Sequence, residues 1–514
     1  MHVPLTTLDF LERAEHVYGA RAAVVDEPNP PGGGLETFSY ADLGRRARSV
    51  AVAFDDLGLA AGERVAILSP NAGRFLTILF GIPAYGRVLV PINFRLNREE
   101  IAYIIEHSGA SALLVDPEYN ELTSTIAVAH RFVLGADTDR ELFKRSGTPK
   151  FVADDETATA TINYTSGTTA RPKGVQMTHR NLWLNAVTFG WHMGITDRDV
   201  YLHTLPTFHC NGWGLPFAVA GMGARQVVIR KIDGEDILDR VEREGVTFLA
   251  GAPAVVAAVL DAAEARMARG EPVPGRDTVR MVVAGAPPPS RLIERVEADL
   301  GWEFMQIYGL TETSPLLTVN RATAEYDDLD AGERARRLAR AGVPAIGVRM
   351  QVDAHGELLA RSNHVFEGYW AQSEATAEAL VDGWFHTGDG GELDDAHIVI
   401  SDRKKDVIIS GGENVSSIEV EDCLFQHPGV AEAAAIGVPD DKWGETVKAL
   451  VVLRPGHETV DEAELIAHCR AHLAHYKCPT SVEFRDELAR TATGKLQKFR
   501  LREPYWVGRA SSVV

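Results

Sequence analysis

The residues from Tyr164 to Gln176, YTSGTTARPKGVQ, have the composition of a phosphate-binding loop. Small hydroxylated side chains and glycine amides can surround a phosphate closely, and Lys173 adds a positive charge. The loop is not the P-loop of nucleoside triphosphatases, which has a second glycine five positions after the first, followed by Lys-Ser or Lys-Thr. Five positions after Gly167 stands Pro172, and Lys173 is followed by Gly174. We therefore expect a phosphate-gripping loop of another kind.

Two acidic residues occupy positions that suit a nucleotide and its metal ion. Glu312 stands between Thr311 and Thr313 in YGLTETSP, after a strand-like run. A carboxylate beside hydroxyls and phosphates offers the hard oxygen ligands that Mg²⁺ prefers. Asp389 ends WFHTGD, and a carboxylate can accept hydrogen bonds from the vicinal hydroxyls of a ribose. Together with the loop, these residues predict a metal-dependent nucleotide site.

The stretch Arg490–Arg502, RTATGKLQKFRLR, is strongly basic within an acidic chain. It carries five basic residues and no acidic one, whereas the whole chain has a formal net charge of −20. A basic segment that contains a glycine hinge indicates contact with an anionic ligand. The overall charge argues against general nucleic-acid binding, which requires a basic face.

Length and composition are those of a globular protein with at least two domains. The chain has 514 residues, of which 45% are hydrophobic and 24% charged. Its 4 cysteines, Cys210, Cys423, Cys469 and Cys478, form no C-x-x-C pair, so the sequence indicates neither a zinc site nor a redox dithiol. The N-terminus lacks the features of a signal peptide, and glycines, prolines and Arg87 interrupt the most apolar run. We expect a cytoplasmic protein without a transmembrane segment.

Strand-like runs alternate with helical patterns over most of the chain. RVAILS, from Arg64, is strand-like, and NREEIAYIIEHSG has a helix cap at Asn97 and a stop at Gly109. This alternation predicts parallel sheets covered by helices, with ligands bound at the carboxyl ends of the strands. Residues 351–400 instead show short strands and tight turns, which are typical of an antiparallel sheet. A small α/β unit follows a boundary near Asp402.

Taken together, the motifs resemble those of one superfamily. YTSGTTARPKG, YGLTETSP, WFHTGD, DRKKDVI, GENVSSIEVE and TATGK occur in the order found in acyl-CoA synthetases of the acyl/aryl-CoA synthetase, adenylation-domain and luciferase superfamily. The chain looks similar to the medium- and long-chain fatty acyl-CoA ligases. The resemblance implies an N-terminal domain, residues 1–401, of two packed α/β sheets with a small antiparallel β part. It also implies a hinge at residues 402–406 and a small mobile α+β C-terminal domain at residues 407–514.

The resemblance assigns roles to the matching residues. In this assignment Lys405 would be the pivot of the hinge, and Lys495 would reach the α-phosphate and the substrate carboxylate. The residues expected to act in catalysis are Lys495, His209, Thr168, Glu312 and Arg403. Mg²⁺ would be held by Thr168 and Glu312, and the ribose by Asp389 and Arg403. The phosphates would be held by Thr165, Ser166, Gly167, Thr168, Thr169 and Lys173. The adenine would be enclosed by Ala284–Pro288, which includes Gly285, Ala286 and Pro287, and by Gln306, Ile307 and Tyr308. Gly309, Leu310 and Thr311 would also bind the cofactor. The pantetheine of CoA would be met by Gly411, Gly412 and Glu413.

The segment TLPTFHCNGWG resembles the start of the acyl-binding helix of this family. His209 would lie beside the substrate carboxylate, and Trp213 matches the gating tryptophan of fatty acyl members. The remaining expected substrate contacts are Asn211, Gly212, Gly285 and Gly309. The chain departs from the family pattern at Ala170, where glycine is usual, at Ala489, where proline is common, at Ile409, where many relatives have lysine, and in a short hairpin at Asp353–Gly356.

The resemblance implies a reaction in two halves, with ATP, Mg²⁺ and CoA. A medium- or long-chain fatty acid, or another bulky hydrophobic acid, would first form an acyl-adenylate. After rotation of the small domain, CoA would displace AMP. Two alternatives stay open at this point: an adenylation enzyme that loads an acyl carrier protein in trans, and a CoA ligase for an aryl or terpenoid acid in specialised metabolism, including antibiotic biosynthesis. Assembly of two chains into a homodimer is also left open by the sequence.

Overall fold

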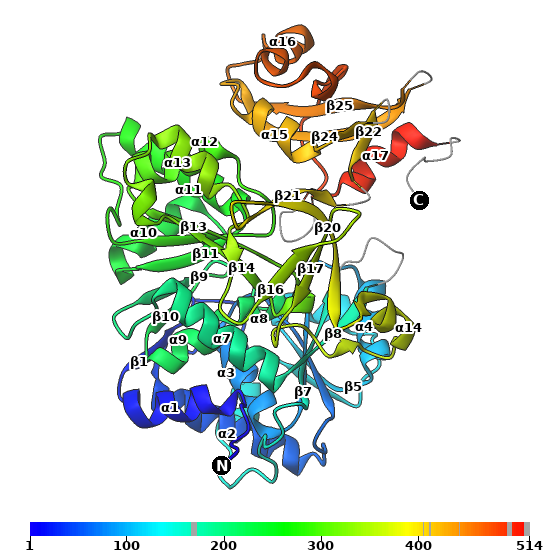
Figure 1. The fold of residues 1–514 in the computed structure, drawn as a ribbon. Helices are drawn as coiled ribbons and strands as arrows, with labels where there is room; N and C mark the ends of the chain where they lie inside the picture. Colours follow the sequence, from blue (N-terminus) through cyan, green and yellow to red (C-terminus); the bar gives the residue numbers. More distant parts are fainter. Residues whose placement is uncertain (166–171, 404–405, 411–412, 441–442, 491–495, 508–514) are drawn as a thin grey trace.

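The computed structural model describes residues 1–165, 172–403, 406–410, 413–440, 443–490 and 496–507, without the side chains at positions 402, 403, 414 and 444. Figure 1 shows a large body that begins at the N-terminus and a smaller one formed by the last part of the chain. The smaller body lies beyond β20 (Trp384–Asp394) and β21 (His397–Arg403).

The first sheet of the large body is mostly parallel, and its strand order is β15-β14-β13-β12-β11-β9-β10-β1-β2 in the described part of the chain. Its strands are β1 (Ala22–Val25), β2 (Thr37–Ser39), β9 (Val200–His203), β10 (Arg225–Val228), β11 (Phe248–Gly251), β12 (Arg280–Val283), β13 (Glu303–Gly309), β14 (Leu316–Arg321) and β15 (Val343–Pro344). β12 and β13 are parallel neighbours, so the loops that follow them leave from the same edge of the sheet.

The second sheet has the order β18-β8-β7-β4-β3-β5-β6. Its strands are β3 (Arg64–Leu68), β4 (Val88–Ile92), β5 (Ala110–Val115), β6 (His130–Val133), β7 (Thr159–Thr165), β8 (Lys173–Thr178) and β18 (Gly368–Tyr369). β7 and β8 form an antiparallel hairpin at one side of an otherwise parallel set. β18, from much later in the chain, is added to the edge of β8.

The hydrophobic core has three layers in the large body, because successive strand residues point to opposite faces. Val65 and Ile67 of β3 belong to the cluster between the two sheets, whereas Ala66 and Leu68 pack on the outer face with α4 (Arg98–Ser108). The helices that contribute to the central cluster are α1 (Leu8–Tyr18), α2 (Tyr40–Asp56), α3 (Gly73–Gly81), α7 (His179–Met193) and α9 (Leu215–Met222). The outer face of the first sheet is covered by α10 (Gly234–Glu244), α11 (Pro253–Ala268), α12 (Ser290–Arg295) and α13 (Ala331–Leu338).

A third, antiparallel sheet completes the large body. It consists of β16 (Arg349–Val352), β17 (Glu357–Arg361), β19 (Leu380–Val381), β20 and β21, with β21 paired to β20. The short helix α14 (Ser373–Ala379) precedes β19. Figure 1 shows β16, β17 and β20 within the large body and β21 on its side toward the smaller one.

The smaller body is an α/β unit with its own core. Its strands are β22 (Ile408–Ser410), β23 (Glu413–Val415), β24 (Val430–Asp440), β25 (Gly444–Leu453) and β26 (Ser481–Phe484), in the order β23-β22-β25-β24 with β26 paired to β25. One face is covered by α15 (Ser417–Phe425) and α16 (Glu462–His472), and the other by α17 (Lys498–Trp506).

These observations confirm the predicted fold class of two α/β sheets, an antiparallel part and a small C-terminal α/β unit. The capping of α4 by Asn97 and its end at Gly109, which has φ +62°, are also as predicted. Ser416 caps α15 by accepting from the Glu419 N–H, and the Glu419 carboxylate accepts hydrogen bonds from Lys477. None of the helices in the described ranges is both long and apolar enough to cross a membrane.

Candidate functional site

The phosphate-type loop connects two paired strands. Thr165 at the end of β7 and Lys173 at the start of β8 are direct cross-strand partners, so the ends of the loop are held together by the hairpin. Both side chains are partly exposed. Of the predicted phosphate contacts, Ser166, Gly167, Thr168 and Thr169 lie outside the described residues. The hairpin therefore fixes where the loop begins and ends.

A half-buried tyrosine connects the predicted metal ligand to this hairpin. The Tyr369 hydroxyl of β18 donates to Oε1 of Glu312 at 3.0 Å, and the Lys173 ammonium lies 4.7 Å from the centre of the Tyr369 ring. The backbone N–H of Phe366 donates to the Glu312 carbonyl at 2.7 Å. Burial, followed by the nearby Glu312 carboxylate, raises the pKa of the Tyr369 hydroxyl, so this group stays a hydrogen-bond donor. Tyr369 thus contacts both residues, Glu312 through its hydroxyl and Lys173 through its ring.

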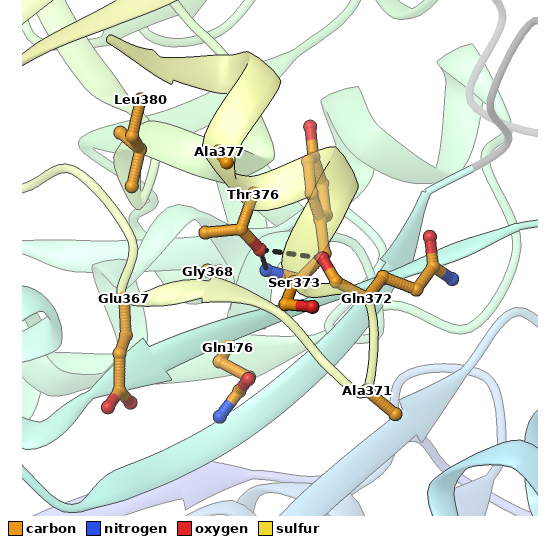
Figure 2. A pocket seen from close by; sticks show the side chains of 10 residues that line it. Gln176, Glu367, Gly368, Ala371, Gln372, Ser373, Thr376, Ala377 and Leu380 are labelled. Carbon is orange, nitrogen blue, oxygen red and sulfur yellow. Dashed lines mark hydrogen bonds between the residues drawn. The ribbon is translucent and has the colours of Figure 1, made fainter.

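Tyr369 was not among the residues predicted from the sequence. Its place in the site depends on the pairing of β18 with β8, in which Tyr369 lies opposite Val175. The tyrosine also lines an open cavity of about 630 Å³ beside α14. Figure 2 shows Thr376 between the strand and the helix; its hydroxyl accepts from the Tyr369 N–H at 2.9 Å and donates to the Gln372 carbonyl at 2.9 Å. The helix therefore fixes the backbone of Tyr369.

The predicted ribose ligand is held by a residue predicted to contact the adenine. The Tyr308 hydroxyl, at the end of β13, donates to Oδ2 of Asp389 in β20 at 2.7 Å, and both residues are buried. Thr387 accepts a hydrogen bond from the Asp389 N–H at 3.1 Å. Asp389 and Arg403 are cross-strand partners of β20 and β21. Asp389, Arg403 and Tyr308 are thus brought together, although the Arg403 side chain is outside the description.

The other predicted adenine contacts lie on two neighbouring loops. Gly285, Ala286 and Pro287 follow β12, while Gly309 ends β13 and Leu310 and Thr311 follow it. At Gly309 a Cβ atom would lie 1.6 Å from the carbonyl oxygen of Pro315, so only glycine fits the turn that leads to Glu312. The buried Gln306 side chain faces the carbonyls of Leu338 and Ala339 at the end of α13, which are 2.8 and 3.2 Å from its amide nitrogen. The Gln306 side chain therefore contacts the end of α13 and supports the strand that precedes the loop.

The segment with the predicted acid contacts is a left-handed turn. From Cys210 to Gly214 five consecutive residues have φ between +47° and +73°, and α9 begins directly after them. Such a conformation costs about 1–2 kcal/mol for each residue other than glycine. Strain of this kind persists only where the surroundings hold it in place, and it occurs often at functional sites. His209 directly precedes the turn and is partly exposed, whereas the Trp213 side chain is buried.

Buried hydrogen bonds connect this turn to the strand that carries the phosphate-type loop. Asn211 donates to the Thr161 hydroxyl at 2.9 Å and accepts from the Asn163 amide at 3.3 Å. Asn163 also donates to the carbonyl of Phe208 at 3.3 Å. Because Thr161 and Asn163 belong to β7, the turn and the loop are positioned by one strand.

Replacing Asn211 with alanine is expected to lower the free energy of unfolding by about 3 kcal/mol. The change leaves Thr161 and Asn163 without their buried partner, at about 1–3 kcal/mol, and puts alanine in a left-handed conformation, at about 1 kcal/mol more. Asn211→Gly is the matched control, because it loses the same hydrogen bonds but tolerates φ +54°. Denaturant unfolding should therefore rank glycine above alanine by about 1 kcal/mol; equal losses would show that the backbone conformation is not strained.

The predicted C-terminal residues divide into described and undescribed ones. Glu413 is exposed in β23, while Lys405, Gly411, Gly412 and Lys495 lie outside the described residues. Two residues of the basic tail are paired within the small domain: Arg490 with Glu432 at 2.7 Å and Lys498 with Glu421 at 2.9 Å. These two cations stabilise the small domain and are not available as the main charges for an anionic ligand.

The large body and the small domain touch through polar groups. Asp422 of α15 accepts hydrogen bonds from the N–H of Ser290 at 2.9 Å and from its hydroxyl at 3.2 Å. Arg291 donates to the carbonyl of Gln426 at 3.2 Å. The small domain's two hydrophobic clusters in the described ranges consist entirely of residues from 408 onwards. An interface of this polar kind is typical of domains that move relative to one another.

Comparison with known proteins finds matches along the whole chain. The model of the AMP-binding enzyme family matches residues 11–370, and that of the AMP-binding enzyme C-terminal domain matches residues 419–495. The chain is 37% identical to 2-methylpropanoate–CoA ligase CCL4 of Humulus lupulus, over 97% of this chain and 95% of that protein. It is 37% identical to 4-hydroxybutyrate–CoA ligase 2 of Metallosphaera sedula, over 97% of this chain and 94% of that protein.

A solved structure agrees with the sequence matches. The crystal structure of the anthranilate CoA ligase AuaEII in complex with anthranoyl-AMP superposes with a TM-score of 0.87 and 27% identity, over 98% of both chains. The cytoplasmic location that we expect from the sequence remains a prediction. The chain belongs to the AMP-binding enzyme family and is an acid–thiol ligase of the AMP-forming acyl-CoA synthetase type.

Proposed function

We propose that this protein joins a carboxylic acid to CoA at the expense of ATP, with AMP and pyrophosphate as the other products. In the first half, a carboxylate oxygen attacks the α-phosphorus of ATP, the bond to the β-phosphate oxygen breaks, and pyrophosphate leaves. In the second half, the CoA thiolate attacks the acyl carbon, and the bond from that carbon to the AMP oxygen breaks. The protein contributes positioning and charge neutralisation, and no covalent nucleophile is needed.

The observation that carries the proposal is the group formed by Lys173, Tyr369 and Glu312. Lys173 follows the phosphate-type loop and lies over the Tyr369 ring, whose hydroxyl donates to Glu312. Glu312 lies in the turn after β13, the strand that carries Tyr308 and thereby the contact with Asp389. A nucleoside triphosphate bound along these residues would have the Lys173 cation near its phosphates and the Asp389 carboxylate near its ribose. This order of groups supports binding of ATP.

Mg²⁺ fits the chemistry of the Glu312 position. The Glu312 carboxylate is a hard oxygen ligand. The Tyr369 hydroxyl donates to its Oε1 and so orients the carboxylate. We assign the metal to Glu312 and Thr168, the latter on the sequence alone. Mg²⁺ would there offset the negative charge on the triphosphate oxygens.

For the acid, we propose a hydrophobic substrate of medium or long chain or of comparable bulk. The buried Trp213, which matches the gating tryptophan of fatty acyl members, supports this choice. A short acid is the second candidate, because the two relatives at 37% identity are named for 2-methylpropanoate and 4-hydroxybutyrate. His209, at the entry to the left-handed turn, would lie beside the carboxylate in either case. Loading of an acyl carrier protein in trans is the alternative for the second half.

The test is ATP–pyrophosphate exchange with a panel of acids, followed by AMP release with free CoA. The panel contains 2-methylpropanoate, 4-hydroxybutyrate, an aromatic acid, and fatty acids of medium and long chain. We expect exchange that requires both Mg²⁺ and an acid but no CoA. Exchange that proceeds equally without any acid would contradict adenylation, and AMP release only with an acyl carrier protein would favour the alternative acceptor.

Replacing Tyr369 with phenylalanine is expected to raise the Mg²⁺ concentration needed for half-maximal exchange by about tenfold. Loss of a group that orients a metal ligand typically costs about 10–100-fold in metal affinity or activity. The ring over Lys173 remains, so the rate at saturating Mg²⁺ should stay near that of the native enzyme. Tyr326→Phe is the control, since Tyr326 is a tyrosine away from this group whose hydroxyl contacts His397. An unchanged Mg²⁺ dependence in Tyr369→Phe would remove the tyrosine from the metal site.

A further inference from the structure

Three potential metal ligands meet on the small domain, away from the proposed reaction site. Cys423, His468 and His472 each offer one ligand atom, and these three atoms lie within 4.8 Å of one another. Cys423 comes from α15 and the two histidines from α16, where residues four positions apart share a face. Cys423 is buried, His468 partly exposed and His472 exposed, so a metal ion from solvent can reach the group.

Both imidazoles are held by backbone carbonyls in the way that metal-binding histidines are. Nε2 of His468 lies 2.9 Å from the carbonyl oxygen of Cys423, and Nδ1 of His472 lies 2.8 Å from the carbonyl oxygen of His468. A carbonyl oxygen only accepts hydrogen bonds, so each of these nitrogens carries the proton. The unprotonated nitrogens are then Nδ1 of His468 and Nε2 of His472. Donation of the other ring N–H to a carbonyl is the usual support of a metal-bound histidine.

We propose that Cys423, His468 and His472 form a Zn²⁺ site. One thiolate and two imidazoles are ligands that Zn²⁺ prefers, whereas Mg²⁺ and Ca²⁺ prefer oxygen. Zinc sites with three protein ligands complete their tetrahedral geometry with water, and the exposed side of His472 leaves room for one. On binding, the thiol proton of Cys423 is released to solvent and the sulfur–zinc bond forms, without any change in oxidation state.

The neighbouring groups have other partners or supporting roles. The ring of His427 lies 5.3 Å from that of His468, but Nε2 of His427 contacts Glu464 at 3.2 Å and Nδ1 accepts from the N–H of Gly429 at 3.2 Å. The buried Cys469 thiol interacts with that of Cys423.

The site would tie together the two helices that cover one face of the small-domain sheet. Cys423 and Cys469 both lie in the hydrophobic cluster under α15 and α16, so zinc would add a bond between helices that already pack together. Asp422, the residue before Cys423, accepts the hydrogen bonds from Ser290 of the large body. Zinc would thus stiffen the helix that makes the polar contact between the domains. The sequence pattern alone indicated no zinc site, because Cys423 is far from His468 and His472 in the chain.

The experiment is a Zn²⁺ titration of the full-length, tag-free protein by isothermal titration calorimetry, after reduction and removal of metals under anaerobic conditions. We expect one Zn²⁺ per chain, and a rise in the thermal unfolding midpoint on its addition. His472→Gln should weaken binding at least 10–100-fold and abolish the rise. His475→Gln is the matched control, since His475 is also exposed, follows three residues later and is not in the cluster. It should bind as the native chain does.

A second measurement tests the thiolate ligand. Co²⁺ in place of Zn²⁺ should give a thiolate-to-cobalt charge-transfer band, which Cys423→Ala loses and His475→Gln keeps. If Cys423→Ala does not fold, the exposed His472→Gln variant still decides the matter. Absence of Zn²⁺ binding to the native chain, or equal binding by native and His472→Gln proteins, would overturn the proposal.

Discussion

Replacing Lys495 with alanine is expected to slow acyl-adenylate formation by about 10³-fold or more, while CoA attack on supplied acyl-adenylate changes by about threefold at most. Loss of one preorganised donor to developing charge typically costs about 10²–10³-fold, and here a full charge between two anions is removed. The carboxylate and the α-phosphate repel each other, and an ammonium between them offsets that repulsion. Under the proposed mechanism the small domain rotates before the second half-reaction, so that Lys495 would no longer take part.

The flanking residues make this a specific test. Arg490 and Leu496 form an antiparallel bridge, and the N–H of Gln497 donates to the carbonyl of Ala489 at 2.8 Å, so both ends of the segment are anchored in the small domain. Arg490 and Lys498 are engaged in ion pairs within the small domain, and the motif TATGK is what assigns the reactive role to Lys495.

The two half-reactions must be measured separately. ATP–pyrophosphate exchange reports the first, and AMP release from synthetic acyl-adenylate with CoA reports the second. Lys495→Arg should not restore the first, because a planar guanidinium does not replace a compact ammonium. Arg500→Ala, an exposed basic residue of the same tail, is the matched control and should leave both unchanged. Equal slowing of both halves by Lys495→Ala would contradict domain rotation, and a fast first half would exclude Lys495 as the catalytic lysine.

Local sequence patterns predicted the elements that position the site. Asn97 and Gly109 set the limits of α4, and the alternating faces of β3 divide Val65 from Ala66 between two cores, because capping and strand periodicity depend on near neighbours. The order of the motifs then indicated the protein family and, through it, the role of Glu312. These features follow from residues close together in the chain.

Features that depend on distant pairing could not be predicted in this way. Tyr369 reaches Glu312 only because β18 joins the edge of β8, and a two-residue strand has no periodicity to detect. The left-handed turn after His209 is stabilised by Asn211 and its partners in β7, which lie far away in the sequence. The same holds for the contact between Ser290 and Asp422. Side-chain hydrogen bonds across such separations become visible only in the folded chain.

Replacing Lys405 with proline is expected to leave adenylation within a few-fold of native and to lower thioester formation by about 10³-fold or more. A hinge residue must change its backbone dihedral angles when a domain rotates, and proline fixes φ near about −65°. The polar contacts of Ser290 and Arg291 with the small domain are few-atom interactions that rotation can exchange for others. A chain unable to rotate would then be held in one of its two catalytic arrangements.

Lys405→Ala is the matched control, because it removes the same side chain and keeps the backbone freedom. Both half-reactions should remain near native in the alanine variant if the role of position 405 is that of a pivot. Loss of thioester formation in both variants would assign the effect to the lysine side chain instead. Equal loss of both half-reactions in the proline variant, with a lowered unfolding midpoint, would indicate damage to the fold. The pivot assignment therefore depends on the difference between proline and alanine in the second half-reaction alone.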